Sequence, residues 1–333
     1  MTRPPLDRRA LGRELTRLAN ASAAELLRGG DSPATGAPAA TPPARRIGLT
    51  GAPGAGKSTL AGHLALHRAR QGAGQGAGQG ARRDAKQGEE GRRVGVLAVD
   101  PSSPRSGGAI LGDRIRMDEL PGAGELYIRS IGSRSTHDGL SDNLPEMLDL
   151  MDAHGFDDVV LETVGVGQAE YAARVQVDTL VLVLLPDSGD AVQAMKAGIM
   201  EMADIFVVNK ADLPGAQRMA ADIRRIAALA HHEAGAWRAP VMLTSVRDST
   251  SVAALSDAID QHQQWLDQAG RRSAAALERA RYCLRRVIER RVAETVRGLG
   301  ARQLALPLAR QVEAVLCDIR SLPDSPTPET RPC

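Results

Sequence analysis

One short segment of the chain has the residue types and spacing to hold phosphate groups. Its sequence is GAPGAGKST, and it directly follows the apolar run RRIGLT. Its spacing G-x-x-x-x-G-K-S is that of a P-loop, in which backbone N–H groups surround the phosphates. We expect the Lys57 ammonium to reach the β- and γ-phosphates and the Ser58 hydroxyl to bind Mg²⁺. The candidate nucleotide-binding residues of the loop are Gly51, Ala52, Pro53, Gly54, Ala55, Gly56, Lys57, Ser58 and Thr59.

A second motif indicates which base is read. The run VVNKAD, residues 207–212, carries Asn209, Lys210 and Asp212 in the spacing N-K-x-D. The Asp212 carboxylate can accept hydrogen bonds from both N1–H and N2–H₂ of guanine, a donor pair that adenine lacks. Two such bonds to a charged group, at about 1.5–3 kcal/mol each, favour guanine by about 10²–10⁴-fold. With the Lys210 stem covering the base plane, the pattern predicts GTP and GDP as ligands.

The run LETVGVGQ, residues 161–168, lies where GTPases keep a D-x-x-G motif. Glu162 replaces the aspartate as the acid near Mg²⁺, and Gly165 is placed to offer its N–H to the γ-phosphate. Gln168 follows closely and is the candidate for positioning the attacking water. Together with Lys57, these three residues are the candidate catalytic residues.

Two further segments supply the remaining candidate ligands. The run LAVDPSSPRSGGAILGDRIRM offers Asp100 and Asp113 as Mg²⁺ ligands beside the serine and glutamate already named. Either aspartate can instead cap a helix. In the run LTSVRD, the backbone of Ser245 and Val246 is the candidate contact for guanine O6.

These motifs need a framework that brings them to one place, and the hydrophobic pattern supplies it. Apolar runs such as VVLETV and TLVLVLLP do not alternate with polar residues, which is typical of strands buried on both faces. We therefore predict an α/β fold of the P-loop NTPase type, with a mostly parallel sheet covered by helices. The expected strands are 46–50, 93–99, 126–130, 158–163, 179–185, 204–208 and 240–244.

The chain divides into four parts along the sequence. Residues 1–44 are predicted to form a helical arm and a Gly/Pro/Ala linker, and residues 45–268 the nucleotide-binding domain. Within that domain, the Gln/Gly-rich segment 71–91 is predicted to be an exposed, disordered insertion, because it has too little apolar surface to offset its ordering entropy. Residues 269–321 are predicted to form a second helical arm, and residues 322–333 a loose tail.

Both arms carry apolar residues at helical spacing. An N-terminal helical segment over residues 6–28 fits better than a transit peptide, because acidic residues are interspersed with the arginines. The C-terminal stripe can either pack inside the chain or form a dimer face. The N-terminal positions are Leu11, Leu15, Leu18, Leu26 and Leu27, and the C-terminal ones are Leu277, Leu284, Val287, Ile288 and Val292.

Composition limits the function classes. The 333 residues have a net charge of +2 and only 2% aromatic side chains, so binding to nucleic acid is not indicated. No run approaches the roughly 18 apolar residues of a membrane span. The three cysteines, Cys283, Cys317 and Cys333, are far apart in the sequence, which favours a reducing cytoplasm over a disulfide framework.

Taken in order, the motifs resemble those of one family. The segments GAPGAGKST, LAVDPSSPRSGGAILGDRIRM, ETVGVGQAE, GIMEMADIFVVNKAD and APVMLTS resemble the methylmalonyl-CoA mutase-associated GTPases, also called MeaB or ArgK. The resemblance covers about residues 6–290. The combination of AVDPSS, GGAILGD and ETVGVGQ is specific to this family.

The resemblance implies a seven- or eight-stranded sheet and a C-terminal arm that forms a homodimer. It implies a slow, Mg²⁺-dependent GTPase that acts as a chaperone for an adenosylcobalamin-dependent acyl-CoA mutase. In this role the GTPase gates cofactor loading and protects the mutase from inactivation, with an adenosyltransferase as a further candidate partner. The older family name implies instead a kinase or ATPase for lysine, arginine and ornithine transport. A third interpretation is a GTPase that delivers a metal ion, a function found in the same branch of the P-loop GTPases.

The chain keeps most of the family's coupling segment and departs from the family pattern nearby. Gly189, Asp190, Gln193 and Lys196 match the mobile segment through which the resemblance implies contact with the partner. Neighbouring residues differ, which leaves the identity of the mutase open. After the base-contact serine, Val246 and Arg247 stand where a small residue is usual, and the Gln/Gly insertion is not part of the family core.

Overall fold

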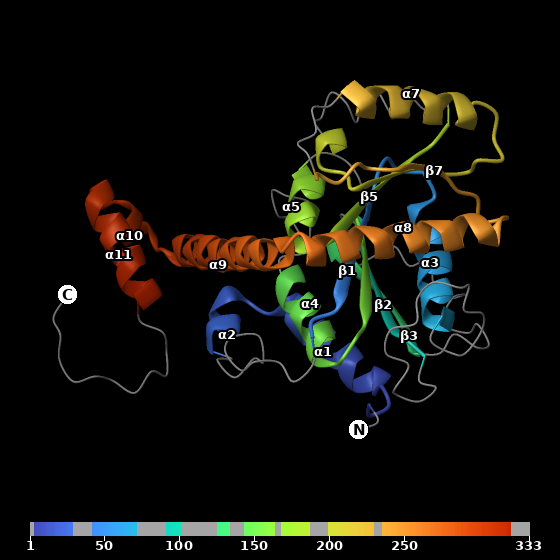
Figure 1. The fold of residues 1–333 in the computed structure, drawn as a ribbon. Coiled ribbons are helices and arrows are strands. Elements are labelled where there is room, and N and C mark those ends of the chain that lie inside the picture. Colours follow the sequence, from blue (N-terminus) through green and yellow to red (C-terminus); the bar gives the residue numbers. More distant parts are fainter. Residues whose placement is uncertain are drawn as a thin grey trace.

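Seven parallel strands form the centre of the molecule (Figure 1). The computed structural model describes residues 3–28, 42–71, 91–101, 125–133, 143–163, 168–186, 199–229 and 235–320, with only the backbone at a few positions such as Asp100 and Gln168. The strand order is β3-β2-β4-β1-β5-β6-β7, and every neighbouring pair is parallel. The strands are β1 (Arg45–Thr50), β2 (Arg93–Pro101), β3 (Glu125–Ser133), β4 (Asp158–Glu162), β5 (Thr179–Leu184), β6 (Ile205–Val208) and β7 (Val241–Leu243).

The predicted α/β fold with a mostly parallel sheet is confirmed. Each predicted strand segment coincides with an observed strand to within a few residues. The apolar runs identified these strands because β4 and β5 are buried at every position, so neither strand has a solvent-exposed face. The predicted insertion 71–91 and tail 322–333 lie almost wholly outside the described residues, and their predicted disorder stays a prediction.

Helices cover both faces of the sheet (Figure 1). Successive strand residues point to opposite faces, so Val181 and Val183 pack against α3 and α8. Leu180 packs on the other face, in the cluster that includes α1, α4 and α5. Leu182 and Leu184 pack against α7 on that same face. These helices are α1 (Arg8–Asn20), α3 (Lys57–Gln71), α4 (Leu144–Ala153), α5 (Gln168–Gln176), α7 (Ala216–Leu229) and α8 (Ser249–Gln268).

The N-terminal arm differs from the single helical segment predicted over residues 6–28. It forms α1 and the short α2 (Ala23–Arg28), because the chain turns into an extended conformation at Ala21. The buried Asn143 amide donates to the carbonyls of Leu18 and Ala21. These are carbonyls that a continuous helix would pair within itself, so a contact from α4 stabilises the break.

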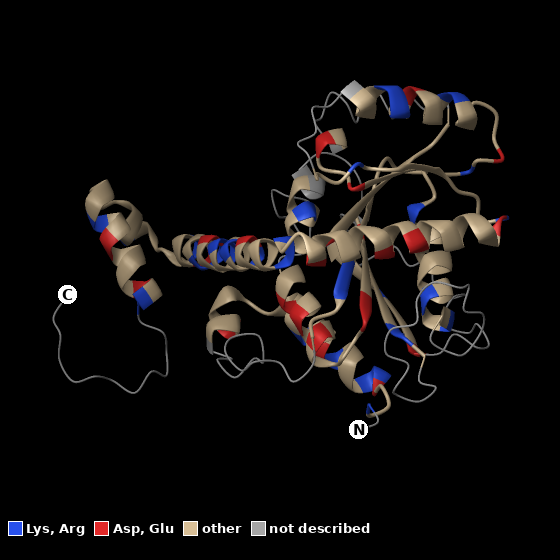
Figure 2. Ribbon diagram, in the orientation of Figure 1, with Lys and Arg blue, Asp and Glu red and all other residues tan. Residues whose placement is uncertain are grey.

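The C-terminal arm projects from the body of the molecule (Figure 1). Gly270, in the left-handed conformation at φ 64°, separates α8 from the long α9 (Arg271–Gly298). Two shorter helices, α10 (Ala301–Leu304) and α11 (Leu308–Arg320), follow. Residues of both charge signs are interspersed along α9, with arginines the more frequent (Figure 2). None of the described helices is long and apolar enough to cross a membrane.

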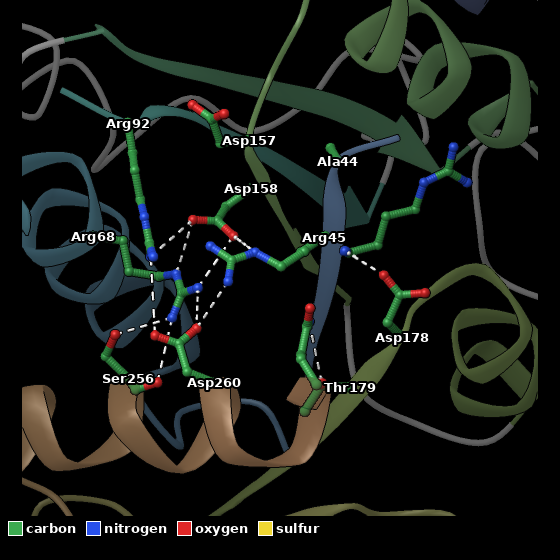
Figure 3. A network of polar contacts seen from close by, with 12 residues as sticks. Ala44, Arg45, Arg68, Arg92, Asp157, Asp158, Asp178, Thr179, Ser256 and Asp260 are labelled. Carbon is green, nitrogen blue, oxygen red and sulfur yellow. Dashed lines mark hydrogen bonds and ion pairs between the residues drawn. The ribbon is translucent and has the colours of Figure 1, made fainter. Parts of the chain in front are cut away.

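The amino ends of β1 and β4 are held by a cluster of charged side chains around a buried ion pair (Figure 3). Arg68 of α3 is fully buried and donates to both carboxylate oxygens of Asp158, each at 3.1 Å. Arg45 Nε lies 2.9 Å from the same carboxylate, and Asp260 of α8 lies 2.7 Å from Arg68. We call these four residues the amino-edge cluster. It connects the first residues of β1 and β4 to α3 and α8.

The charges of this cluster depend on one another. Burial alone would raise the pKa of Asp158, but Arg68 and Arg45 lower it below its usual value. Burial alone would likewise lower the pKa of Arg68, but Asp158 and Asp260 raise it. Both groups are therefore ionised at neutral pH, and removing one charge leaves the other buried without its main partner.

We predict that Asp158→Asn lowers the free energy of unfolding by about 3 kcal/mol, because it leaves the Arg68 guanidinium buried beside a neutral amide. Urea unfolding at pH 7 measures the change. The matched control is Asp222→Asn, which removes an exposed ion pair with Arg225 and should cost about 0–1 kcal/mol. Equal losses in the two variants would show that the cluster contributes no more than a surface pair.

Candidate nucleotide-binding site

The residues predicted to bind nucleotide lie at the carboxyl ends of the strands. The phosphate loop, residues 51–56, connects the end of β1 to the start of α3. Glu162 is the last residue of β4, and the N-K-x-D residues directly follow β6. Because all strands are parallel, these ends meet at one edge of the sheet, which is where open α/β folds bind ligands. We call it the carboxyl edge, opposite to the amino-edge cluster.

Two glycines of the phosphate loop are required by close backbone approaches. Gly51 has φ 138°, and a Cβ there would lie 1.9 Å from the Val183 carbonyl oxygen. Gly56 has φ 85°, and its Cβ would lie 2.6 Å from Asn209 Nδ2. A side chain at either position would collide with the neighbouring loop or strand, so the loop can take this shape only with glycine there.

Lys57 begins α3 and folds back over the loop. Its ammonium group donates to the carbonyl oxygens of Gly51 at 2.6 Å and Ala52 at 2.9 Å, and its side chain is buried. The cation therefore lies at the mouth of the loop, beside the N-terminus of α3. Both the positive charge and the helix dipole favour an anion at this place.

Ser58 and Glu162 meet beside the phosphate loop. The Ser58 hydroxyl donates to Glu162 Oε1, and the Glu162 side chain is buried at the end of β4. A hydroxyl and a carboxylate side by side are a donor set that suits Mg²⁺, which keeps several waters and phosphate oxygens as its other ligands. These two residues thus fit the predicted metal site.

The other candidate catalytic and metal-binding residues are described in part or not at all. Asp100 lies near the end of β2, and Gln168 is the first residue of α5, each with its backbone alone described. Asp113 and Gly165 lie outside the described residues, as do Gly189, Asp190, Gln193 and Lys196. Their roles stay predictions.

Asn209 joins the loop after β6, which carries the N-K-x-D residues 209–212 and is called the base loop below, to the phosphate loop. Its buried amide donates to the Ala55 carbonyl at 2.8 Å and accepts from the Thr244 hydroxyl at 3.0 Å. Lys210, in the left-handed conformation at φ 54°, donates to the Gly54 carbonyl at 3.0 Å. The loop that is expected to read the base is therefore fixed relative to the loop that is expected to hold the phosphates.

Asp212 is oriented by the loop after β7. The Ser245 hydroxyl donates to Asp212 Oδ1 at 2.9 Å, and this hydrogen bond is the main reason that the pKa of Asp212 lies below its usual value. The carboxylate is therefore ionised at neutral pH, as two hydrogen bonds from guanine require. Val246 lies next to this serine with an exposed side chain, so the structure brings both predicted O6 contacts to the base loop.

Sequence reasoning missed two positioning residues. The Thr244 hydroxyl holds the Asn209 amide, and the Thr163 hydroxyl donates to the Thr50 hydroxyl at 3.1 Å, tying the end of β4 to the end of β1. The sequence signal for either is no more than a threonine at the end of a predicted strand. Such residues are too common after strands to be singled out.

Fold and site together define a P-loop GTPase. The family model described as "Methylmalonyl Co-A mutase-associated GTPase MeaB" matches residues 82–300. The chain therefore belongs to the MeaB family of GTPases, and the predicted resemblance is confirmed.

Individual relatives agree with this assignment. A putative GTPase of Pyrococcus abyssi is 40% identical over 68% of this chain and 64% of its own length. A putative GTPase of Pyrococcus horikoshii is 37% identical over 91% of this chain and 86% of its own. The mitochondrial methylmalonic aciduria type A homolog of Mus musculus is 35% identical over 69% of this chain and 51% of its own. The chain thus spans less than two thirds of two of these relatives.

A solved structure supports the fold. The crystal structure described as an LAO/AO transport system kinase superposes with a TM-score of 0.56, covering 96% of this chain and 100% of that one. Its sequence identity is 22%, so the likeness concerns the fold alone.

We predict that Asp212→Asn weakens GDP binding by about 10²-fold or more and raises the relative affinity for xanthosine diphosphate, because the amide now donates where guanine also donates. Xanthine, which carries an oxygen at position 2, can accept from that amide. Titration calorimetry of the wild type and the variant measures the dissociation constants of both nucleotides. A variant that keeps the wild-type preference for GDP would show that Asp212 does not read the base.

Proposed function

We propose that this GTPase serves an adenosylcobalamin-dependent acyl-CoA mutase of the methylmalonyl-CoA type, gating the loading of its cofactor and protecting it from inactivation. The observation that carries the proposal is the match to the mutase-associated family over residues 82–300. The name of the mouse relative, which refers to methylmalonic aciduria, supports it. A cytoplasmic location and an adenosyltransferase as second partner belong to the same proposal.

The nucleotide chemistry follows from the residues at the carboxyl edge. Ser58 and Glu162 would hold Mg²⁺, which supplies charge neutralisation at the β- and γ-phosphate oxygens. Lys57 and the loop N–H groups stabilise the charge that develops on the transferred phosphoryl group. No arginine finger can be assigned from the sequence, so we expect slow turnover that a partner accelerates.

The route from nucleotide to partner is proposed from chain order. Glu162 ends β4, and α5 begins at Gln168, so the predicted γ-phosphate contact lies between these two described elements. The predicted coupling segment 187–198 follows β5 and ends at the short helix η2 (Ile199–Glu201). In the sheet, β1 lies between β4 and β5, and all three strands are parallel. Segments that follow parallel strands start from the same edge, where the presence or loss of a phosphate can change both.

We also propose that the C-terminal arm forms a homodimer. Leu277, Leu284 and Ile288 of α9 are 53%, 64% and 50% exposed in the single chain, and Leu308 of α11 is 74% exposed. A row of large apolar side chains at helical spacing on a projecting helix is typical of an association surface. The predicted stripe is thus mostly exposed, which favours the dimer face over packing inside the chain.

The two alternative functions, a transport-linked kinase and a metal-delivery GTPase, have less support. The printed name of the LAO/AO structure refers to a transport system kinase, but at 22% identity that likeness shows only the fold. The transport-linked kinase and the metal-delivery GTPase each lack an observation of their own among the described residues.

We predict that Gln193→Ala with Lys196→Ala keeps basal GTP hydrolysis within a few-fold of the wild type and removes most of the acceleration by a mutase. The reason is that the change cuts the proposed link and leaves the phosphate loop intact. Hydrolysis is measured with and without each acyl-CoA mutase of the same organism, and Lys57→Ala is the control that loses basal turnover. If no mutase accelerates the wild type, the chaperone proposal is wrong and the nucleotide site still stands.

We expect Leu284→Glu with Ile288→Glu to convert a dimer into a folded monomer, since four charges would face each other across the interface. Light scattering after size-exclusion chromatography gives the mass, and circular dichroism checks the fold. Leu27→Glu, at an exposed leucine of α2 in the N-terminal arm, is the matched control and should leave the mass unchanged. A monomeric wild type at micromolar concentration contradicts the proposal.

A further inference from the structure

A hollow of about 1400 Å³ lies at the amino ends of β6 and β7, on the side of the sheet opposite to the candidate nucleotide site. Its walls come from η2, the end of α7, α8 and the first turns of α9. It therefore lies at the base of the C-terminal arm, where α8 leads into α9 (Figure 1). A hollow of this size has room for a small-molecule ligand.

Both tryptophans of the chain line this hollow. The Trp237 N–H donates to the Asp204 carbonyl at 2.8 Å, and the Trp265 N–H donates to the Gly235 carbonyl at 3.2 Å. The two ring centres are 5.9 Å apart, and both side chains are only half-buried. Because each N–H is satisfied within the protein, the ring surface that stays exposed is apolar and suits the apolar part of a ligand.

The buried polar side chains of the hollow carry no net charge together. The Asp204 carboxylate accepts from the Leu180 N–H at 2.8 Å and lies 3.3 Å from Arg174 Nη1. Burial raises the pKa of Asp204 to about 6, so this carboxyl is mostly ionised at pH 7 and offsets the charge of Arg174. Burial lowers the pKa of His262 to about 4, so its imidazole is neutral at the same pH.

The charges at the rim of the hollow are unequal. Of the remaining acids that line it, Glu278 is paired with Arg281 at 2.6 Å, which leaves Glu201 among the described residues. The lining arginines outside the buried pair are Arg224, Arg238 and Arg271. The guanidinium of Arg271 lies 4.9 Å from the centre of the Trp265 ring. The rim thus places an excess of cations beside the exposed ring surface.

We propose that this hollow binds a small organic anion with an apolar body, of the kind that a medium-chain carboxylate represents. Trp237 and Trp265 contact the apolar body, and Arg238 and Arg271 bind the acid group, as guanidinium groups bind carboxylates. The excess of cations at the rim disfavours an amine of the same shape, because like charges repel each other. Since the phosphate loop lies at the other edge of the sheet, this anion does not compete with a nucleotide.

Tryptophan fluorescence reports on this hollow alone, because both tryptophans lie in it. The full-length chain is titrated at neutral pH with octanoate, octylamine and octanol, which share one apolar body and differ in charge. We expect a saturable change in emission with octanoate and a dissociation constant at least about fivefold lower than that of octylamine. Octanol, which is neutral, measures the apolar contact by itself.

Removing the rim charges tests the binding of the acid group. Arg238→Ala with Arg271→Ala should weaken octanoate by about five- to tenfold, because exposed charges contribute modestly, and should leave octanol nearly unchanged. The matched control is Arg302→Ala with Arg310→Ala, which removes two exposed arginines of α10 and α11 outside the hollow. This control should bind octanoate like the wild type.

Removing a ring tests the apolar contact. Trp265→Ala, followed by the emission of Trp237, should weaken octanoate and octanol by similar factors, because both lose the same apolar surface. Circular dichroism checks that each variant is folded. In the wild type, an excess of GDP with Mg²⁺ should leave the octanoate titration unchanged.

Four results would overturn the inference. They are the absence of a saturable change with octanoate, equal affinities for octanoate and octylamine, unchanged octanoate affinity in the double-arginine variant, and unchanged octanoate affinity in Trp265→Ala. Displacement of octanoate by GDP would also overturn it, since the anion would then bind at the phosphate loop.

Discussion

The parallel direction of all seven strands is the constraint on which the rest of the structure depends. It places the end of β1, Glu162 of β4 and the residues after β6 and β7 at one edge, although they are far apart in sequence. The same constraint gathers the strand starts at the other edge. There, Arg68 and Asp158 bind the outer helix α3 to the sheet through a fully buried ion pair. The amino-edge cluster thus fixes the amino ends of β1 and β4, and the carboxyl edge carries the loops that are expected to bind the nucleotide.

At the carboxyl edge, hydrogen bonds connect the loops of the candidate site to each other. Asn209 reaches the Ala55 carbonyl, and Gly56 leaves the space that this amide needs. The phosphate loop and the base loop therefore cannot move independently, and a nucleotide meets both in a fixed relation. Such preorganisation reduces the ordering cost of binding. The Ser245 hydroxyl likewise connects the loop after β7 to Asp212 of the base loop.

The sequence predicts those features that depend on local pattern. The strand TLVLVL is buried at every position and apolar at all but the first, and the glycine spacing of the phosphate loop follows from backbone geometry that only glycine allows. Contacts between distant segments are not encoded locally. The break between α1 and α2 is stabilised by Asn143, the residue before α4, and the Asn209 amide is held by Thr244. The partner-coupling segment lies outside the described residues, and its role rests on the family resemblance.

The central claim is that the joined loops form one site that selects guanine nucleotides. Titration calorimetry of the wild-type chain with GDP and with ADP, in the presence of Mg²⁺, tests it most directly, because both ligands offer the same phosphates to Lys57 and differ only at the base. The account predicts that GDP binds at least about 10²-fold more tightly than ADP, from two hydrogen bonds to the Asp212 carboxylate. Equal affinities for the two nucleotides would contradict it.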